Sequence, residues 1–481
     1  MFDILLSDQS DHPLYLQLYR QIRGHIRSGV IANDTRLPSV RTLQHQLNIS
    51  KTPIETAYQM LAAEGYVVSK PRSGLYAVNP NAGRPPAPRR PLPERRREAP
   101  PPRSVRTPPP SDGFIDFNPT AVDRDAFPVR LWKKMLGEAL EQSPARLSQY
   151  GDAQGEMSLR AVLADYLLQA RGVACAPEQL VIGSGISYSI GLLTKLLTDK
   201  RCVAVEEPGF APVRDHFAGS GFRVVPIPVH ERGLSVEGLL ASEAEVVYVT
   251  PSHQFPTGSV MPYAEREYLL RWANERGGYI VEDDYNGEFR YIGKPIPSLQ
   301  SLDEQGRVAY IGTFSKAFTP AVRLNYMVLP IGLLEKLGTM PHLLVGPSRV
   351  EQWAMQAFIE QGHWYRHIRK MRHMYRKKQQ KLIELLQAHF AGCVEITGHS
   401  AGLHIQAAVR TDRTAAELLA LAAAAGVRVY DMAQSPINGG DPGEVRIYLG
   451  FAGLREGEME AGVRQLKKAW SGRLDEAFNK R

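Results

Sequence analysis

Residues 311–323, I-G-T-F-S-K-A-F-T-P-A-V-R, place a single lysine, Lys316, among small, hydroxyl and aromatic residues of otherwise interior character. A lysine in such surroundings loses hydration, which lowers the pKa of its ammonium group and makes the neutral amine available as a nucleophile. Such an amine can form a Schiff base. Most lysines are solvated surface groups, however, so the rest of the chain must decide between the two interpretations.

Working outward from this stretch, residues 113–481 alternate short β-like runs with longer helical patterns, which is typical of a doubly wound α/β domain. The runs are nearly continuous in valine and isoleucine, so the strands are expected to be covered on both faces in a largely parallel sheet. Ligands of such sheets bind beyond the C-terminal ends of the strands. The expected strands are residues 180–183, 202–205, 246–249, 279–285, 308–312 and 324–329.

Polar residues fall at these strand ends. Gly183, Ser184 and Gly185 lead from a strand into a helix, which presents N–H groups and a hydroxyl to an anion such as phosphate, although many such turns are glycine-rich only for geometry. In V-E-D-D-Y, strand alternation places Asp283 and Tyr285 on one face. They form either a buried structural pair or a carboxylate and a phenol that bind a pyridinium nitrogen and a phenolic oxygen.

Further groups of this kind surround Lys316, since Thr313 and Ser315 precede it and Arg323 follows it. An amine, a carboxylate, a phenol and an anion cradle together suit pyridoxal 5'-phosphate (PLP). A nucleotide site fits less well, because the sequence has no GxxxxGK[ST] motif and no GxGxxG after the first strand of the large domain.

Residues 1–79 are predicted to form a winged helix-turn-helix of the α+β class. Apolar residues recur every four positions from Leu14 to Ile26 and predict a first helix that ends at Gly29. A second short helix follows L-P-S-V-R, and Ser50 is expected to cap a third. The runs Y-V-V-S and L-Y-A-V flank K-P-R-S-G and predict a two-stranded ribbon with a basic tip.

This module offers a surface for double-stranded DNA. The first turn of the third helix is expected in the major groove, with basic residues of the second helix and the ribbon on the phosphates. A small interaction domain is the alternative, since each basic residue taken alone is more often a solvated charge. The expected DNA-binding residues are Ser39, Arg41, Lys51, Thr52, Thr56, Lys70 and Arg72.

Charge is distributed unevenly along the chain. Residues 1–110 contain 16 Lys/Arg and 8 Asp/Glu, whereas the remaining 371 residues contain 42 of each. This asymmetry predicts a basic module that meets a polyanion, attached to a neutral body. Between them, residues 80–112 are rich in proline and arginine with almost no apolar residues, and predict a solvated, semi-extended linker.

Membrane and metal functions are not expected. No apolar run approaches the ~18 residues that span a bilayer, and the first residues carry acids where a signal peptide carries bases, so a cytoplasmic location is expected. The three cysteines, Cys175, Cys202 and Cys393, are scattered and form no metal-binding pattern. The basic run 363–381 predicts a long helix with a solvated or dimer-facing side.

Two sets of motifs carry a family resemblance. P-L-Y-L-Q-L-Y-R-Q-I-R-G-H-I-R-S-G, L-P-S-V-R and I-S-K-T-P-I-E-T-A-Y resemble the DNA-binding domain of GntR-type bacterial regulators. T-P-S-H-Q-F-P-T-G, V-E-D-D-Y-N-G-E-F-R-Y, Y-I-G-T-F-S-K-A-F and H-I-R-K-M-R resemble the MocR (GabR-like) regulators, which fuse that domain to an α/β fold type I PLP-dependent aminotransferase-like domain. The resemblance implies a homodimer, a DNA operator, and a small amine or amino acid as effector.

The resemblance also implies roles for individual residues. Lys316 would carry PLP as a Schiff base, Asp283 would bind the ring nitrogen and Tyr285 the ring oxygen, and Phe210 would stack on the ring. The phosphate would be held by Ser184, Gly185, Ser315 and Arg323. His253 falls near the expected cofactor and is interpreted as a structural loop histidine.

Two departures bear on mechanism. Phe255 stands where the aminotransferase motif N-P-T-G has an asparagine, and Tyr448 stands where an arginine binds the substrate carboxylate. Arg446, on the same strand face, is either an effector ligand or a rim charge. These departures favour a regulator that senses its effector by transimination at Lys316 over an active aminotransferase that carries a DNA-binding module. A third alternative is a DNA-binding structural protein with an inactive cofactor fold.

Overall fold

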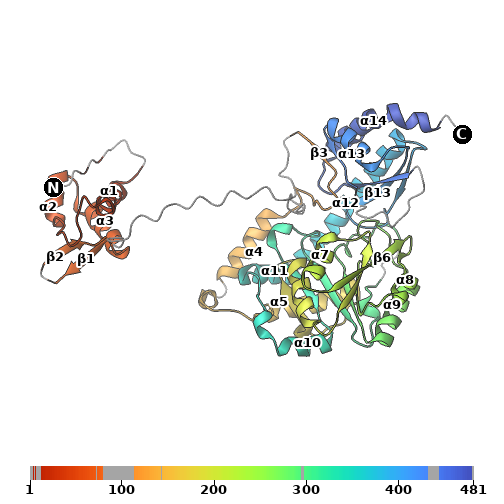
Figure 1. Ribbon diagram of the computed structural model, residues 1–481, viewed down its shortest axis with the longest axis horizontal. Coiled ribbons are helices and arrows are strands. Elements are labelled where there is room, and N and C mark those ends of the chain that lie inside the picture. Colours follow the sequence, from red (N-terminus) through yellow and green to blue (C-terminus); the bar gives the residue numbers. More distant parts are fainter. Residues whose placement is uncertain are drawn as a thin grey trace. The chain divides into compact units, whose positions relative to one another are not determined.

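The computed structural model describes residues 4, 6, 12–71, 73–79, 113–141, 144–293, 297–431 and 444–478, with side chains described up to residue 470. It divides into two compact units, residues 1–108 and 109–481 (Figure 1). The expected linker, residues 80–112, and the expected DNA contact Arg72 lie outside the described residues.

The first unit is a three-helix bundle with a β-ribbon, which confirms the predicted winged helix-turn-helix. Its helices are α1 (Leu14–Ser28), α2 (Val40–Leu47) and α3 (Lys51–Ala63). The ribbon pairs β1 (Val67–Lys70) with β2 (Gly74–Ala77) in antiparallel register. Leu18, Ile22, Ile54 and Leu61 are fully buried at its centre, because their spacing of four or seven residues aligns them on the inner helix faces.

The ends of these helices follow the sequence closely. Gly29 adopts a left-handed conformation (φ 81°) and ends α1 as predicted. Ser39 caps α2, since its hydroxyl accepts a hydrogen bond from the Thr42 N–H at 3.1 Å. Ser50 occupies the capping position of α3, but its side chain accepts no capping hydrogen bond within the described part of the unit, so that part of the prediction is wrong.

A largely parallel central sheet organises the second unit, as predicted. The described residues form eight strands in this sheet: β4 (Leu180–Gly183), β5 (Cys202–Glu207), β6 (Arg223–His230), β7 (Gly233–Leu234), β8 (Val246–Val249), β9 (Tyr279–Asp283), β10 (Val308–Thr313) and β11 (Asn325–Val328). Their order is β4-β11-β10-β9-β8-β5-β6-β7, and only β11 and β7 run antiparallel to their neighbours. The sequence prediction missed β6, because Pro226 and Pro228 argue against a strand; they are tolerated near the sheet edge.

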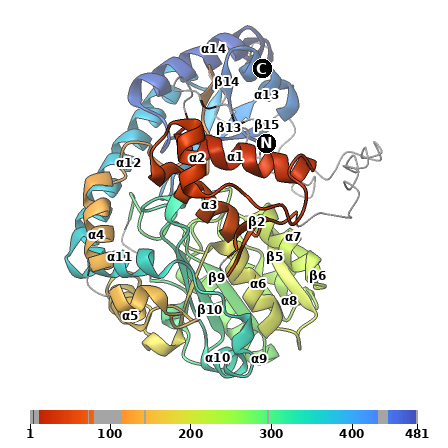
Figure 2. The ribbon, with the colours of Figure 1, turned by 90° about the vertical axis from the view of Figure 1, so that its left-hand side faces the viewer.

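Helices cover both faces of this sheet. The helices are α4 (Val129–Glu141), α5 (Met157–Arg171), α6 (Ile186–Leu196), α7 (Ala211–Gly219), α8 (Val236–Ala241), α9 (Tyr263–Arg276), α10 (Ile331–Gly338), α11 (Arg349–Glu360) and α12 (His363–His389). Short 3-10 helices are η1 (Pro144–Ser148), η2 (Pro177–Gln179), η3 (Gln300–Leu302), η4 (Pro320–Val322) and η5 (Pro341–Leu343). One face packs against α6, α7 and α10, and the other against α5, α8, α9, α11 and α12. Figure 2 shows β9 and β10 between α5 and α6.

A smaller subdomain follows the long helix α12, which extends beyond the predicted residues 363–381. Its antiparallel sheet has the order β12 (Val394–Thr397), β13 (His404–Arg410), β15 (Glu444–Gly450). The helices α13 (Ala415–Ala424) and α14 (Glu456–Phe478) complete the subdomain. At the start of the unit, β3 (Ile115–Asp116) pairs in parallel with β14 (Val427–Arg428). The first segment of the unit is therefore drawn back onto its last subdomain.

Over the described ranges, none of the helices combines the length and apolar composition that a membrane crossing requires. The same ranges contain no cluster of three or more His, Cys, Asp or Glu side chains placed to hold a metal ion.

Candidate functional site

Strand register brings the predicted polar residues to one edge of the central sheet. Asp283 lies beside Ile311 in the parallel pairing of β9 and β10. Thr313 at the end of β10 lies opposite Asn325, which in turn lies opposite Gly183 at the end of β4. The C-terminal ends of three parallel strands therefore meet where ligands of such sheets bind.

Lys316 follows β10 and reaches the loop after β3. Its Nζ donates a hydrogen bond to the carbonyl oxygen of Thr120 at 2.6 Å. Burial lowers the pKa of Lys316 to about 8, and the nearby carboxylate of Asp283 acts in the opposite direction. A neutral amine is therefore far more accessible here than on an ordinary lysine.

Asp283 is buried and held by a residue that the sequence analysis missed. The hydroxyl of Tyr248, on the neighbouring strand β8, donates to Asp283 Oδ2 at 2.6 Å. Burial raises the pKa of Asp283 to about 7, while this hydrogen bond lowers it. The available signal was the phenol within the apolar run V-V-Y-V, since a buried tyrosine requires a hydrogen-bond partner.

Tyr285 lies in the turn beyond β9, which ends at Asp283, so strand alternation does not place it as predicted. The turn nevertheless keeps it close enough to Asp283 for that charge to help raise the pKa of Tyr285 well above its ordinary value, after the larger effect of burial. Its hydroxyl is 3.0 Å from Nδ1 of His253, a buried residue. His253 thus contacts one of the predicted site residues directly.

An anion cradle forms where α6 begins. Gly185 has φ 118°, and a Cβ there would lie 2.5 Å from Arg323 Nη2, so both conformation and clearance require glycine. Arg323 Nη2 donates to the carbonyl oxygen of Ser184 at 2.8 Å. The N–H groups of Ile186 and Ser187 open the helix and have no carbonyl of an earlier turn to bind. A guanidinium group and a helix N-terminus therefore converge at one point.

Two neighbouring contacts refine this cradle. The N–H of Gly185 donates to Asn325 Oδ1 at 2.8 Å, so it is used internally rather than directed at an anion. Asn325 was missed by the sequence analysis, because its role depends on the antiparallel pairing of β11 with β4. The hydroxyl of Thr313 accepts from the N–H of Ser315 at 3.1 Å, which orders the turn leading to Lys316.

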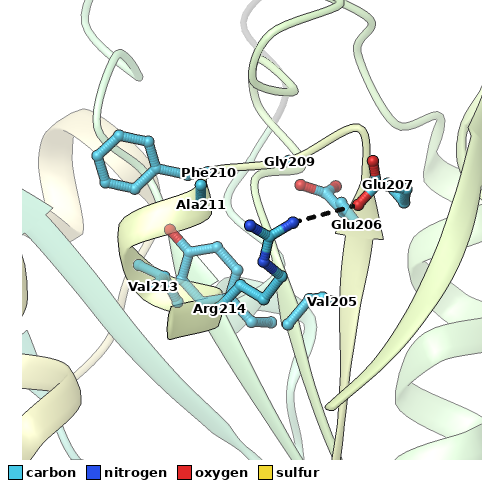
Figure 3. Close-up of a pocket in the computed structure, with 9 residues that line it drawn as sticks. Val205, Glu206, Glu207, Gly209, Phe210, Ala211, Val213 and Arg214 are labelled. Carbon is cyan, nitrogen blue, oxygen red and sulfur yellow. Dashed lines mark ion pairs between the residues drawn. The ribbon is translucent and has the colours of Figure 1, made fainter. Parts of the chain in front are cut away.

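Phe210 occupies the N-cap position of α7, shortly after β5, and packs edge-on against Phe255, with ring centroids 5.5 Å apart. Figure 3 shows its ring directed away from Glu207 and Arg214, whose side chains form an ion pair at 3.9 Å. Glu206 lines the pocket drawn in Figure 3 together with these residues; it is buried and accepts a hydrogen bond from Thr250 Oγ1 at 2.6 Å. Burial raises the pKa of Glu206 to about 7.

The two residues predicted to bind effector lie on β15 in different environments. Tyr448 is buried, and its hydroxyl accepts from Gln406 Nε2 at 3.0 Å. Arg446 is half exposed, and its Nε donates to Glu444 Oε1 at 3.1 Å. The His404 ring lies 6.4 Å from that of Tyr448, and Lys316 helps to lower the pKa of His404, to about 4, after the larger effect of burial. His404, which lies beside Tyr448, is therefore close enough to Lys316 for the charge of the lysine to affect it.

The side chains predicted to bind DNA lie on the outside of the first unit. Ser39 and Arg41 are exposed where α2 begins, and Lys51 and Thr52 are exposed in the first turn of α3. Thr56 is partly buried. Lys51 pairs with Glu55 at 2.9 Å, and Lys70 pairs with Asp34 at 2.5 Å while its Nζ lies 4.2 Å from the Tyr76 ring centroid. The two lysines are thus partly neutralised within the unit.

Two family models match the chain. The model described as "Aminotransferase class I and II" matches residues 118–466, and the model described as "Bacterial regulatory proteins, gntR family" matches residues 14–76. Each match falls within one of the two compact units.

Similar proteins combine both parts. The chain is 38% identical over 470 residues to "Uncharacterized HTH-type transcriptional regulator YdeL" of Bacillus subtilis (strain 168), covering 97% of this chain and 98% of the relative. It is 33% identical to "Probable rhizopine catabolism regulatory protein MocR" of Rhizobium meliloti, covering 97% and 96%. Among solved structures, the α-aminoadipate aminotransferase LysN of Thermus thermophilus, complexed with N-(5'-phosphopyridoxyl)-L-leucine, has a TM-score of 0.64 and 26% identity, covering 76% of this chain and 94% of that one.

Proposed function

Since the chain belongs to the family of GntR-type transcriptional regulators that carry a class I and II aminotransferase domain, we propose that its DNA binding is controlled by PLP and by a small amine or amino acid that exchanges with Lys316. The observation that carries this proposal is the meeting of a desolvated lysine amine, a tyrosine-held carboxylate and an arginine-lined helix start at one sheet edge.

The donor set fits PLP. Lys316 would bind the aldehyde carbon, Asp283 the ring nitrogen and Tyr285 the ring oxygen, while Phe210 would cover a ring face. The phosphate would be held by Ser184, Thr313, Ser315 and Arg323, and Gly185 would leave room for it beside Arg323. The Gly185 position supports this assignment, because any larger residue would fill the cradle beside Arg323. When bound, PLP supplies an electron-withdrawing ring and an aldehyde that condenses with primary amines.

The chain's own residues prepare this exchange. Tyr248 favours the ionised form of Asp283, which can then hold a proton on a ring nitrogen. Lys316 with a pKa of about 8 is neutral in roughly a tenth of molecules at pH 7 and can act as a nucleophile. When an effector amine takes its place, Lys316 Nζ is free to return to the carbonyl oxygen of Thr120. Effector binding would thus alter a contact between the loop after β3 and the large sheet.

The effector itself would contact Tyr448 and Arg446. Tyr448 offers a phenol held by Gln406, and Arg446 offers a guanidinium group that an acid group on the effector must share with Glu444. Only a ligand that binds two arrangements of the protein unequally can shift the population between them. We attribute the regulatory response to such a shift, relayed to the DNA-binding unit.

A homodimer is part of the proposal. Large apolar side chains are exposed on η1, on the loop after it and on the loop before α11, with Leu147 at 48%, Tyr150 at 104% and Val345 at 68% of full exposure. Arg349 of α11 holds η1 and the loop after it, since its Nε donates to buried Glu156 and its Nη1 to the carbonyl oxygens of Arg146 and Gln149. A rigid exposed apolar patch of this kind is typical of a protein interface.

Reduction with borohydride followed by peptide mass mapping tests the covalent attachment. In PLP-loaded protein we expect a phosphopyridoxyl mass on the peptide containing Lys316, and none in Lys316→Ala. The same variant should bind operator DNA but lose its response to effector in a mobility-shift assay. A normal response by Lys316→Ala would overturn the proposal. Repeated conversion of amine and keto acid would instead assign the alternative function, an active aminotransferase with a DNA-binding module.

A further inference from the structure

Two adjoining cavities of about 380 and 250 Å³ lie where α5, the turn after β9 and α12 meet. They share Arg171, Glu288 and Arg372 in their walls. Two sequence motifs converge there, V-E-D-D-Y-N-G-E-F-R-Y (281–291) and H-I-R-K-M-R (367–372). Residues of the first motif beyond Tyr285, and the arginines of the second, have no part in the function proposed above.

The charges that line these cavities do not balance. Arg171 is buried and offset by Asp284, with Nε to Oδ2 at 2.6 Å. The other lining cations are Arg290, Arg369 and Arg372, and Glu288 is the one carboxyl group among the lining residues. Burial raises the pKa of Glu288 to about 7, so this carboxyl group is only partly ionised near neutrality. The cavities therefore carry a net positive charge.

Arg372 is held in place by one hydrogen bond, and both Arg372 and Arg290 have hydrogen-bonding capacity that the described residues do not use. Arg372 Nε donates to the carbonyl oxygen of Glu288 at 2.9 Å, which orients the guanidinium group and leaves its Nη groups for other partners. Arg290 Nε is buried and has no hydrogen-bond partner among the described residues, and Asn286 Oδ1 is in the same condition. Buried polar groups normally have partners, so unpaired ones in a cavity wall indicate a polar occupant.

We propose that this arginine-lined cavity is a second ligand site, separate from Lys316, that binds a small metabolite through a carboxylate or phosphate group. Guanidinium groups match the planar, bidentate geometry of these oxyanions. The bound anion would supply acceptors to Arg290 and Arg372 and offset the excess charge. The cavity sizes suit a small molecule rather than a macromolecular segment.

Isothermal titration calorimetry with two probes, sodium succinate and inorganic phosphate, tests this site at constant ionic strength. We expect one probe to bind the full-length protein, and the preferred probe distinguishes a carboxylate ligand from a phosphate ligand. Arg290→Gln and Arg372→Gln should each weaken that binding about tenfold or more, since each removes a charge-assisted hydrogen bond. Arg372 is exposed on α12, so its replacement tests the site even if Arg290→Gln folds poorly.

Two matched variants separate this site from other sources of anion binding. Arg376→Gln removes the same charge from an exposed position one turn farther along α12, outside the cavity walls. Arg323→Gln removes the arginine of the cradle at α6. Arg376→Gln should bind the probe like the parent. Arg323→Gln should lose at most a separate binding event at the cradle and keep the one that Arg290→Gln and Arg372→Gln weaken. The proposal would be overturned if Arg323→Gln abolished all binding of the probe, or if Arg376→Gln weakened binding as much as the cavity variants do. It would also be overturned if Arg290→Gln and Arg372→Gln left binding unchanged, or if neither probe bound. None of these outcomes depends on PLP.

Discussion

In the first unit the side chains expected to meet DNA, such as Lys51 and Thr52, are exposed on a helix whose opposite face supplies the core. In the second unit the expected cofactor ligand Asp283 is itself buried, and its pKa depends on Tyr248. DNA contacts can therefore be changed with little effect on folding, because phosphate binding uses charges that water already solvates. Cofactor contacts cannot be separated from the packing that holds them, because burial creates their chemistry.

The largest expected effect comes from breaking the core of the first unit alone. Ile54→Ala removes a fully buried side chain and should lower the free energy of unfolding of that unit by about 2–5 kcal/mol. Its hydrophobic cluster contains only residues of the first unit, so the transition of the second unit should be unchanged in calorimetry. Val68→Ala, at a 41% exposed position, is the control, with an expected change within about 0.5 kcal/mol. A common shift of both transitions would show that the units unfold together.

A smaller effect is expected from removing the phenol that holds Asp283. Tyr248→Phe deletes a hydrogen bond to a charged group, worth about 1.5–3 kcal/mol, so the pKa of Asp283 should rise by about one to two units. Covalent binding of PLP needs ionised Asp283 and neutral Lys316. In the parent protein it should therefore increase with pH in two steps, near pH 7 as Asp283 ionises and near pH 8 as Lys316 loses its proton, and level off above. In a spectrophotometric pH titration of PLP binding, the lower of the two midpoints, which reports Asp283, should lie at a higher pH in Tyr248→Phe than in the parent.

Tyr310→Phe is the matched control for that titration. Its hydroxyl donates to the neighbouring Asp284 at 2.8 Å rather than to Asp283. The lower midpoint should stay at the parental pH in this variant. An equal upward movement in both variants would mean that the profile reports general damage to the sheet.

DNA binding should respond more modestly, and unequally, to the loss of two exposed cations. Arg41→Ala is expected to reduce the slope of log affinity against log salt by about one, as the loss of one phosphate contact does. Lys70→Ala should reduce it less, because Asp34 already offsets that charge at 2.5 Å. Fluorescence anisotropy over a salt series measures both slopes. If Lys70→Ala gave the larger loss, the ribbon would be the main phosphate contact.

The smallest effect is expected at Arg446. Its ion pair with Glu444 is half exposed, so Arg446→Gln should change the free energy of unfolding by less than about 1 kcal/mol. Effector titrations should show a loss of a few fold for amino acids and none for amines without an acid group, because only the former use the guanidinium group. Equal losses for both classes would remove Arg446 from the effector site.

Local sequence was sufficient for the parts of this protein that depend on neighbouring residues. Four-residue spacing placed Leu18 and Ile22 in one core, and the β-branched runs placed the strand that carries Asp283 and the strand that precedes Lys316. Side-chain periodicity is set by the geometry of a single helix or strand, so it can be read without knowing what lies opposite. The division into two units and the position of Lys316 after a buried strand could be predicted for the same reason.

Only the tertiary structure determined which distant residues meet. The hydroxyl of Tyr248 donates to Asp283 because β8 and β9 are neighbours in the sheet. Lys316 contacts Thr120, 196 positions earlier in the sequence, only because the chain folds back on itself. Arg290 and Arg372 line one cavity because α12 crosses the turn after β9. Strand order and helix crossing are settled by burial summed over the whole core, and no local pattern records them.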